Sequence, residues 1–382
     1  MKQVLYYILS CAVNGTELEV ERLRNVTPEE WQEVYLLGKA QGVTGLLFDK
    51  VKTLPKEVAP PREVVMQWMS HTMSIERQTK VLFQKSAEFA ELMSQEGMQT
   101  MVLKGLALSG YYPNPWHREY GDLDCYLYEV KDGKVMWEGC YERGNSVAEA
   151  HGIEVKRGFY KHSHINLKGL EVENHQFALP IKDGPEVMAL ERELRRLVAT
   201  PERMKQIGQT YLYRPSADFT ALFLTAHSLS HFLFESIKLR HVLDWAFFVK
   251  AEHQHVDWEN FWKWCERMKY TRFVMCMNYI CVHYLGMELP AEVNKQGDEK
   301  VATLSERILD DIFGGYSLYT QNHSGLMHRV MIIKSYLKGL WKFHEVHQRN
   351  AFWLMARRVK NYWVKDVRLE GKVNDERLKV KG

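Results

Sequence analysis

The stretch Arg118-Glu-Tyr-Gly-Asp-Leu-Asp-Cys-Tyr-Leu-Tyr128 predicts more about the fold and chemistry of this chain than any other segment. From Asp122 onward it is rich in strand-forming residues, and successive side chains of a strand point to opposite faces. Asp122 and Asp124 should therefore lie on one face of a strand, with Leu123 on the other. Two carboxylates on one face can share a hard cation such as Mg²⁺, which also binds phosphates. The alternative is a solvated or ion-paired role, because Asp-x-Asp pairs recur by chance.

Further strands are predicted on both sides of this one. Residues 98–103 form a short apolar run, and three later segments, 153–156, 162–167 and 170–177, are interpreted as strands of a hairpin or meander. Alternation along the last of these places Glu173 and His175 on one face. The alternative to a functional face is one that is simply exposed to solvent. The middle of the chain is therefore predicted to contain a small mixed β-sheet.

Helical patterns flank this block on both sides. Thr27-Pro-Glu-Glu30 has the residues of a helix start, with Thr as N-cap, Pro at the first helical position and Glu three residues after the cap. Pro60-Pro61 opens a second long helical stretch, and helical periodicity returns after Pro185 and holds to the end. We therefore predict an α+β protein in three parts: an N-terminal helical region (1–98), an α+β core (99–183) and a C-terminal helical domain (184–382).

Composition and charge exclude several classes of protein. With 382 residues, of which 46% are hydrophobic and 26% charged, the chain has the composition of ordinary globular proteins rather than disordered or fibrous ones. The net charge of +3 gives no reason to predict nucleic-acid binding. The six cysteines form no Cys-x-x-Cys pair, so reduced, mostly buried thiols are expected. No apolar run reaches the roughly 18 residues of a membrane span, and we expect a cytoplasmic protein.

Three motifs together carry a resemblance to a known family. They are Leu103-Lys-Gly105, Arg118-x-x-Gly-Asp-Leu-Asp124 and the strand Val172-Glu-Asn-His175. With these motifs the chain resembles the nucleotidyltransferase superfamily of the DNA polymerase beta type, and especially its bacterial group of uncharacterised nucleotidyltransferases. The resemblance covers about residues 99 to 180 and extends more loosely into the following helices.

The resemblance implies a reaction and a metal site. It implies that Asp122 and Asp124 bind magnesium ions, with manganese as a substitute, that bridge a nucleoside triphosphate such as ATP. It also implies that Glu173 helps to position the ion that activates an acceptor hydroxyl for attack on the α-phosphate. The acceptor could be a small molecule, a sugar phosphate, a protein side chain or an RNA end.

Several neighbouring residues are candidates for contacts with the nucleotide. The wider superfamily has a Gly-Gly or Gly-Ser pair where this chain has Lys104-Gly105, but Gly105 can still let the backbone approach phosphates. Lys104 could bind a phosphate or be solvated at a strand end. Arg118 could clamp a phosphate through two hydrogen bonds or brace the loop before Gly121. His175, which ends the third motif, is a further candidate.

A helical segment downstream contains His227 and His231, which are four residues apart and share one helical face. This spacing suits a pair of metal ligands, but hydrogen bonding between packed helices is the preferred interpretation. A second interpretation places this helix opposite Asp122 and Asp124, with either histidine touching the nucleotide or the acceptor.

Two alternatives to an active transferase follow from the same residues. The first is a catalytically silent relative that keeps the fold for a regulatory or antitoxin-like role. The second is a metal-dependent phosphohydrolase centred on His227, His231 and Asp244, although the adjacent His-Asp pair of that class is missing. The presence of Asp122, Asp124 and Glu173 favours the transferase.

The end of the chain is basic. Residues 356–382 contain nine Lys and Arg against four Asp and Glu, together with Tyr362 and Trp363. This segment could contact a membrane surface or nucleic acid, but its mixed charges favour a solvated helix.

Overall fold

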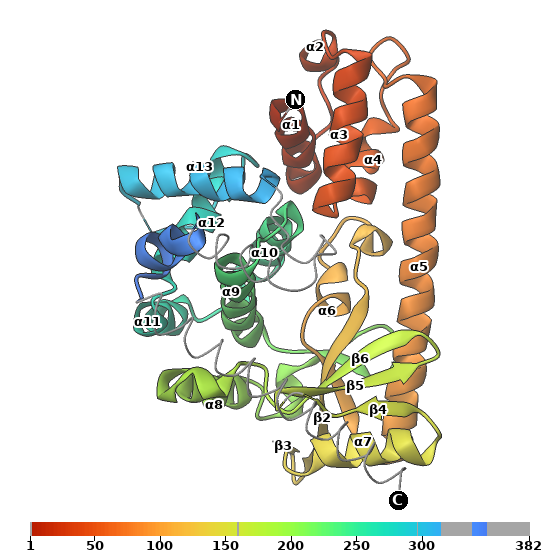
Figure 1. The fold of residues 1–382 in the computed structure, drawn as a ribbon, viewed down its shortest axis with the longest axis vertical. Helices are drawn as coiled ribbons and strands as arrows, with labels where there is room; N and C mark the ends of the chain where they lie inside the picture. The colour runs from red at the N-terminus through yellow and green to blue at the C-terminus, as the bar shows by residue number, and fades with distance from the viewer. Residues whose placement is uncertain (1, 159, 296, 315–337, 350–382) are drawn as a thin grey trace, which may run out of the picture.

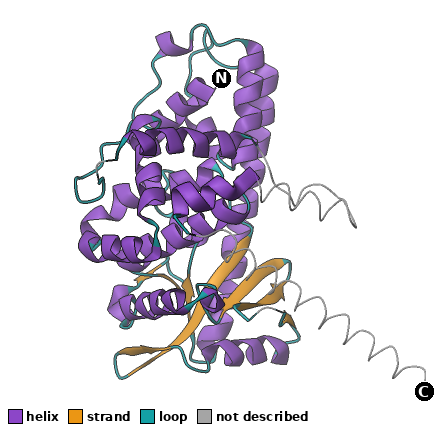
Figure 2. Cartoon of the chain, turned by 60° about the vertical axis from the view of Figure 1, so that its left-hand side comes forward, coloured by secondary structure: helices purple, strands orange, loops and turns teal. Residues whose placement is uncertain are grey.

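The computed structural model describes residues 2–158, 160–295, 297–314 and 338–349. In these residues, one mixed β-sheet is surrounded by helices (Figures 1 and 2). The predicted α+β class, with a mixed sheet between helical regions, is confirmed. Among the described helices, none has the length and apolar character needed to span a membrane. The basic segment 356–382 lies outside the described residues.

The N-terminal part is helical, as its start signals predict. Thr27 caps its helix through the backbone N–H of Glu30, whose side chain accepts a hydrogen bond from the Thr27 N–H in return. The last of these helices, α5, is 34 residues long and runs beside both the N-terminal helices and the sheet (Figure 1). The helices are α1 (Lys2–Asn14), α2 (Val20–Leu23), α3 (Pro28–Gln41), α4 (Thr44–Val51) and α5 (Arg62–Gln95).

Eight strands of the described chain form the sheet. The order along it is β4-β5-β6-β2-β1-β8-β7, and β3 extends a hairpin from β2. The pairs β2–β6 and β1–β8 are parallel, and the other pairs are antiparallel. The strands are β1 (Gln99–Val102), β2 (Asp122–Lys131), β3 (Lys134–Met136), β4 (Glu154–Lys156), β5 (His162–Leu167), β6 (Leu170–His175), β7 (Lys205–Gln206) and β8 (Leu212–Arg214).

Helix α7 and the short strands β3, β7 and β8 were not predicted. Helix α7 (Cys140–Ala150) contains Gly144, which weakens the helical signal but fits closely under β2, because a Cβ there would collide with the Leu127 side chain. Strands β7 and β8 are too short for a periodic pattern, and β8 is held by its pairing with β1. The prediction of unbroken helix after Pro185 is therefore wrong at these two strands. The three-part division of the chain stays a prediction.

The C-terminal helices lie beside the sheet and pack against the N-terminal ones. A core of apolar residues is shared by α1, α3 and α4 with α9 to α13. The helices are α8 (Pro185–Leu197), α9 (Ala217–Phe234), α10 (Leu239–Glu252), α11 (Trp258–Met268), α12 (Thr271–His283) and α13 (Glu299–Phe313), and α6 (Leu106–Ser109) follows β1. Short 3-10 turns lie at Pro115–His117, Ile181–Asp183, Pro201–Arg203 and His253–His255, and a π-helical segment at Lys342–His347.

The two faces of the sheet have different surroundings. One face, which includes Leu123, Cys125 and Val172, packs with α5 and α7 in a second apolar core. The alternation predicted for β2 is therefore found, because Asp122 and Asp124 project from the opposite face. All six cysteines are buried and form no disulfide, as expected.

Candidate active site

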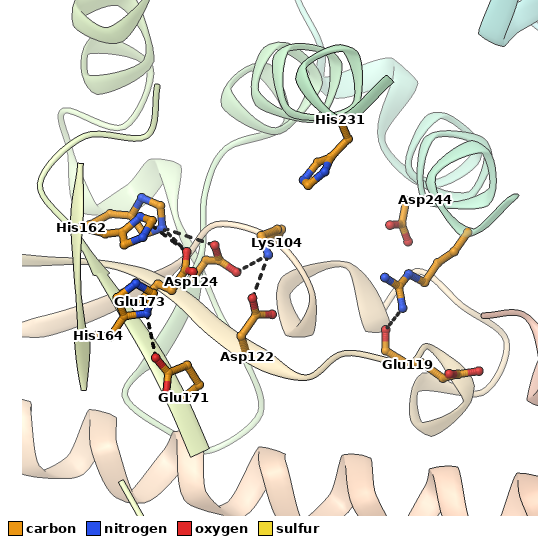
Figure 3. A network of polar contacts seen from close by, with 12 residues as sticks. Lys104, Glu119, Asp122, Asp124, His162, His164, Glu171, Glu173, His231 and Asp244 are labelled. Carbon is orange, nitrogen blue, oxygen red and sulfur yellow. Dashed lines mark hydrogen bonds and ion pairs between the residues drawn. The ribbon is translucent and has the colours of Figure 1, made fainter. Parts of the chain in front are cut away.

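Three carboxylates meet where β2 runs beside β6. These strands pair in parallel, with Asp122 opposite Glu171 and Asp124 opposite Glu173. Paired residues on neighbouring strands project from the same face, so this register brings the predicted residues together. One oxygen each from Asp122, Asp124 and Glu173 lies within 4.8 Å of the others (Figure 3).

Lys104 supplies a positive charge to this group from the end of β1. Its Nζ lies 3.2 Å from Asp122 Oδ2 and 2.5 Å from Asp124 Oδ2. Burial disfavours the charge of the lysine, but Asp124 and Asp122 outweigh that effect and raise its pKa. The ammonium group therefore occupies a position where the carboxylates require a cation.

The donor set fits a divalent cation. It offers only oxygen atoms, which Mg²⁺ and Mn²⁺ prefer. Burial and the neighbouring Asp124 raise the pKa of Asp122, so the pair repels itself even beside Lys104. Burial also disfavours the charge of Asp124, but Lys104 and His175 hold its pKa well below the usual range. A second positive charge would relieve the repulsion that remains.

Two glycines line the approach to the carboxylates. Gly105 has a φ of +60°, and an added Cβ would meet Tyr120 Cβ at 3.3 Å, so the turn after β1 requires glycine. Gly121 has open space around it, because an added Cβ would meet nothing within 4 Å. Gly121 is exposed and leaves the backbone accessible beside Asp122, whereas Gly105 is buried against Tyr120.

Arg118 braces the loop that precedes β2. Its Nε and Nη2 donate to the two carboxylate oxygens of Asp244 on α10, at 3.1 and 2.7 Å. The Tyr112 hydroxyl also donates to Asp244, at 2.8 Å, and Arg118 and Asp244 are each 5% exposed. Of the two roles predicted for Arg118, these contacts support bracing, and phosphate binding stays a prediction.

His175 connects two of the carboxylates. Its Nδ1–H donates to the Phe177 carbonyl at 3.0 Å, and its Nε2 lies 3.3 Å from both Asp124 Oδ1 and Glu173 Oε2. Burial disfavours a charge on His175, but its contacts with Asp124 and Glu173 raise its pKa. The predicted position of His175 beside Glu173 is thus found, and His175 also contacts Asp124.

Two residues that lie beside the three carboxylates were not predicted. His162 on β5 lies directly opposite His175, because the turn Lys168-Gly169 has positive φ at both residues and fixes the register of the hairpin. That turn and the His162-x-His164 spacing could have revealed His162 from the sequence. Lys161 precedes β5, where burial lowers its pKa and the charges of Asp124 and Glu173 oppose that shift. Its loop position carries no sequence signal.

The predicted histidine pair lies on α9, on the same side of the sheet as the carboxylates. The rings of His227 and His231 are 4.5 Å apart, and His231 Nδ1 lies 3.0 Å from Glu235 Oε2. His231 points from α9 toward Lys104 and Asp122 (Figure 3). Burial, then His231 and Lys104, hold the pKa of His227 well below its ordinary value, so this ring is neutral.

The alternative metal centre of a phosphohydrolase does not form in the described residues. Neither His227 nor His231 belongs to a group of three possible metal ligands there. Both carboxylate oxygens of Asp244, the expected third ligand, accept hydrogen bonds from Arg118 instead.

Comparison with known proteins agrees with this geometry. A family model described as an uncharacterised nucleotidyltransferase matches residues 27–286, from the cap of α3 to beyond α12. The chain belongs to this nucleotidyltransferase family. The match includes the whole sheet and every residue proposed for the site. Searches of the curated proteins and of the solved structures gave no match.

Proposed function

We propose that this nucleotidyltransferase-family protein transfers a nucleotidyl group from a nucleoside triphosphate to a hydroxyl group, with Mg²⁺ as cofactor. The observation that carries the proposal is the convergence of Asp122, Asp124 and Glu173 beside Lys104. Such a group can bind a hard cation together with the phosphates that the cation attracts.

The binding roles follow from position and charge. Asp122 and Asp124 would hold the ion, which would neutralise the triphosphate and orient it for in-line attack. Lys104 and Lys161 are the cations next to these carboxylates and would contact phosphate oxygens. Gly121, which is exposed beside Asp122, would let the backbone approach the phosphates.

Glu173 would act on the side of the acceptor hydroxyl. Burial disfavours its charge, but the hydrogen bond from His175 lowers its pKa, so the carboxylate stays anionic near neutral pH. An anionic Glu173 next to Asp124 would help to hold the cation that faces the acceptor hydroxyl. The acceptor oxygen would bond to the α-phosphorus as the bond to the departing pyrophosphate breaks, and the hydroxyl proton would pass to solvent.

Helix α9 would contribute to nucleotide or acceptor recognition. His231 faces the carboxylates, and His227 is held neutral by burial (Figure 3). A neutral imidazole can donate one hydrogen bond and accept another, which suits the polar edge of a nucleotide or an acceptor.

A thermal-shift screen tests the proposal directly. The full chain is heated with each nucleoside triphosphate, with and without MgCl₂, because a ligand that binds only the folded state raises the melting temperature. We expect a shift that needs both components and is absent in Asp122→Asn. The control is Glu171→Gln, which removes a carboxylate on the same sheet face that pairs with His164. No shift with any triphosphate would refute the proposal.

A transfer assay with triphosphate labelled at the α-phosphate then tests turnover. Label transfer to an acceptor supports the enzyme. Nucleotide binding without transfer to any acceptor offered would favour the regulatory or antitoxin-like alternative.

A further inference from the structure

We propose a second metal site beside the three carboxylates, formed by His162, Glu173 and His175 and suited to a transition-metal ion such as Zn²⁺. The proposed transferase reaction needs only the oxygen-only group of Asp122, Asp124 and Glu173. The histidine-containing site therefore goes beyond that reaction, and it can be present or absent independently of it.

The spacing of the ligand atoms is the first argument. Glu173 Oε2 lies 3.6 Å from His162 Nδ1 and 3.3 Å from His175 Nε2. Two ligands held about 2.0–2.1 Å from zinc at a tetrahedral angle lie about 3.3 Å from each other. Asp124 Oδ1 also lies 3.3 Å from His175 Nε2, but Asp124 is not part of the group that His162, Glu173 and His175 form, so water would supply the fourth ligand. The two distances to Glu173 Oε2 are thus close to those expected around a four-coordinate ion.

The orientation of the histidines is the second argument. The Nδ1–H of His175 donates to the Phe177 carbonyl at 3.0 Å, which directs Nε2 toward Glu173. Metal-binding histidines are commonly fixed by such a bond from the other ring nitrogen to a carbonyl. His162 lies opposite His175 in the hairpin, with their ring centres 4.9 Å apart. The backbone therefore sets both rings in place without help from an ion.

The kind of ligand decides which ion would bind. Imidazole nitrogens favour zinc and other transition metals, whereas a set of carboxylates alone suits Mg²⁺. Asp124 separates the two groups, because its Oδ2 faces Lys104 and its Oδ1 faces His175. Glu173 belongs to both groups. Two neighbouring ions of different character could thus share Glu173.

Metal binding at the proposed second site can be measured in the absence of nucleotide. Metal-free full-length protein is titrated with CoCl₂, followed by visible absorption, and with ZnCl₂, followed by calorimetry. We expect one equivalent to bind, with the intense visible bands of four-coordinate cobalt. His162→Gln and His175→Gln should each weaken zinc binding on the order of a hundredfold or more, because each removes a ligand.

His164→Gln is the matched control. His164 lies two residues along β5 on the same face, but it contacts Glu171 at 2.7 Å instead of Glu173. Its replacement should leave zinc affinity unchanged. Circular dichroism checks the fold of each variant, and if the buried His175→Gln fails to fold, the more exposed His162→Gln carries the test. Absence of stoichiometric zinc binding, or equal weakening by His164→Gln and His162→Gln, overturns the site.

The variant Asp122→Asn distinguishes the second metal site from the proposed transferase activity. Asp122 belongs to the oxygen-only group and not to the histidine group. Asp122→Asn should therefore lose magnesium-dependent nucleotide binding and keep zinc affinity, whereas His162→Gln should do the opposite. Zinc binding that survives His162→Gln at wild-type strength overturns the second site and leaves the transferase proposal standing.

Discussion

Asp122 and Asp124 lie two residues apart on β2 but differ in burial and partners. Asp124 is 3% exposed and contacts both Lys104 and His175. Asp122 is more exposed, and its contact with Lys104 is the longer of the two. Their pKa values shift in opposite directions. Burial and then repulsion by Asp124 raise the pKa of Asp122, whereas Lys104 and His175 outweigh burial and lower the pKa of Asp124.

The two single asparagine variants should differ in stability. Asp124→Asn leaves Lys104 with a weaker partner in a buried site, and we expect it to lower the free energy of unfolding on the order of 3 kcal/mol. Asp122→Asn removes a repulsion and should change stability little. Urea denaturation in metal-free buffer measures both, and both variants should lose magnesium-dependent nucleotide binding. Equal stability loss in the two variants would contradict the assignment of their partners.

Glu173 distinguishes nucleotide binding from transfer. Gln keeps the volume and hydrogen bonding of Glu173 but removes its charge, so nucleotide binding through Asp122 and Asp124 should survive. Transfer should fall on the order of a hundredfold or more, since a ligand on the acceptor side is lost. The check is a comparison of nucleotide affinity with the rate of label transfer, with Glu171→Gln alongside. A larger loss of transfer in Glu171→Gln would assign the role to that residue instead.

At the scale of elements, His117 joins the turn before β2 to two N-terminal helices. Its Nδ1 lies 2.5 Å from Asp49 Oδ2 on α4, and its Nε2 lies 2.8 Å from Glu76 Oε1 on α5. Burial opposes a charge on His117, but the two carboxylates raise its pKa. Gly45 makes room for this ring, because an added Cβ would lie 2.7 Å from His117 Cγ.

This contact predicts a pH dependence of stability. The pKa of His117 is raised above 6.5, so its contribution is complete below pH 6.5 and is lost as pH rises through the folded-state value. The pKa of Asp49 is lowered by His117 and Lys52, against the effect of burial, and that of Glu76 is lowered by His117 and Lys80. Their contributions are present above their ordinary values of 3.8 and 4.5 and fade as pH falls through the lowered values.

The contacts of His117 with Asp49 and Glu76 should therefore contribute most to the free energy of unfolding between about pH 4.5 and 6.5. Urea denaturation of wild type and His117→Gln at pH 5.5 and 8.5 measures this contribution. We expect the difference between the two proteins to be larger at pH 5.5. A difference that is the same at both pH values would show that His117 is not protonated in the folded state.

At the scale of the whole molecule, Arg118 and Asp244 tie the sheet to the C-terminal helices. They are 126 residues apart in the chain, and their two hydrogen bonds hold the loop before β2 against α10. The side chains are only 6% exposed, so the pair is protected from water. The position of Asp122 at the start of β2 depends on this loop.

Breaking this pair should be costly. Asp244→Asn leaves a buried guanidinium group without its charged partner, and we expect a loss of about 3–5 kcal/mol in the free energy of unfolding. Replacing both Arg118 and Asp244 with Leu should recover part of the loss, because no buried charge then remains. Denaturation of the single and double variants measures this coupling. Additive losses would show that the two residues do not act as a pair.

The predictions from sequence succeeded where the determining interactions are local. The capping box at Thr27 and the alternation that places Asp122 and Asp124 on one face can be identified from neighbouring residues. Short-range periodicity and hydrogen bonding set these features, so they remain visible without knowledge of the fold. The turn Lys168-Gly169 belongs to the same class, because the positive φ of these two residues is a local property that fixes the register of the hairpin.

Only the tertiary structure decided how these local pieces meet. The parallel pairing of β2 with β6 puts Glu173 beside Asp124, although the two residues are 49 positions apart in the chain. Strand β8 pairs with β1, although it lies outside the predicted core of residues 99–183. The pairing of Lys104 with the carboxylates, of Arg118 with Asp244 and of His117 with two helices likewise depends on long-range packing. Sequence patterns do not specify such contacts, because burial and register across the whole molecule select them from many alternatives that are equally compatible with the local chain.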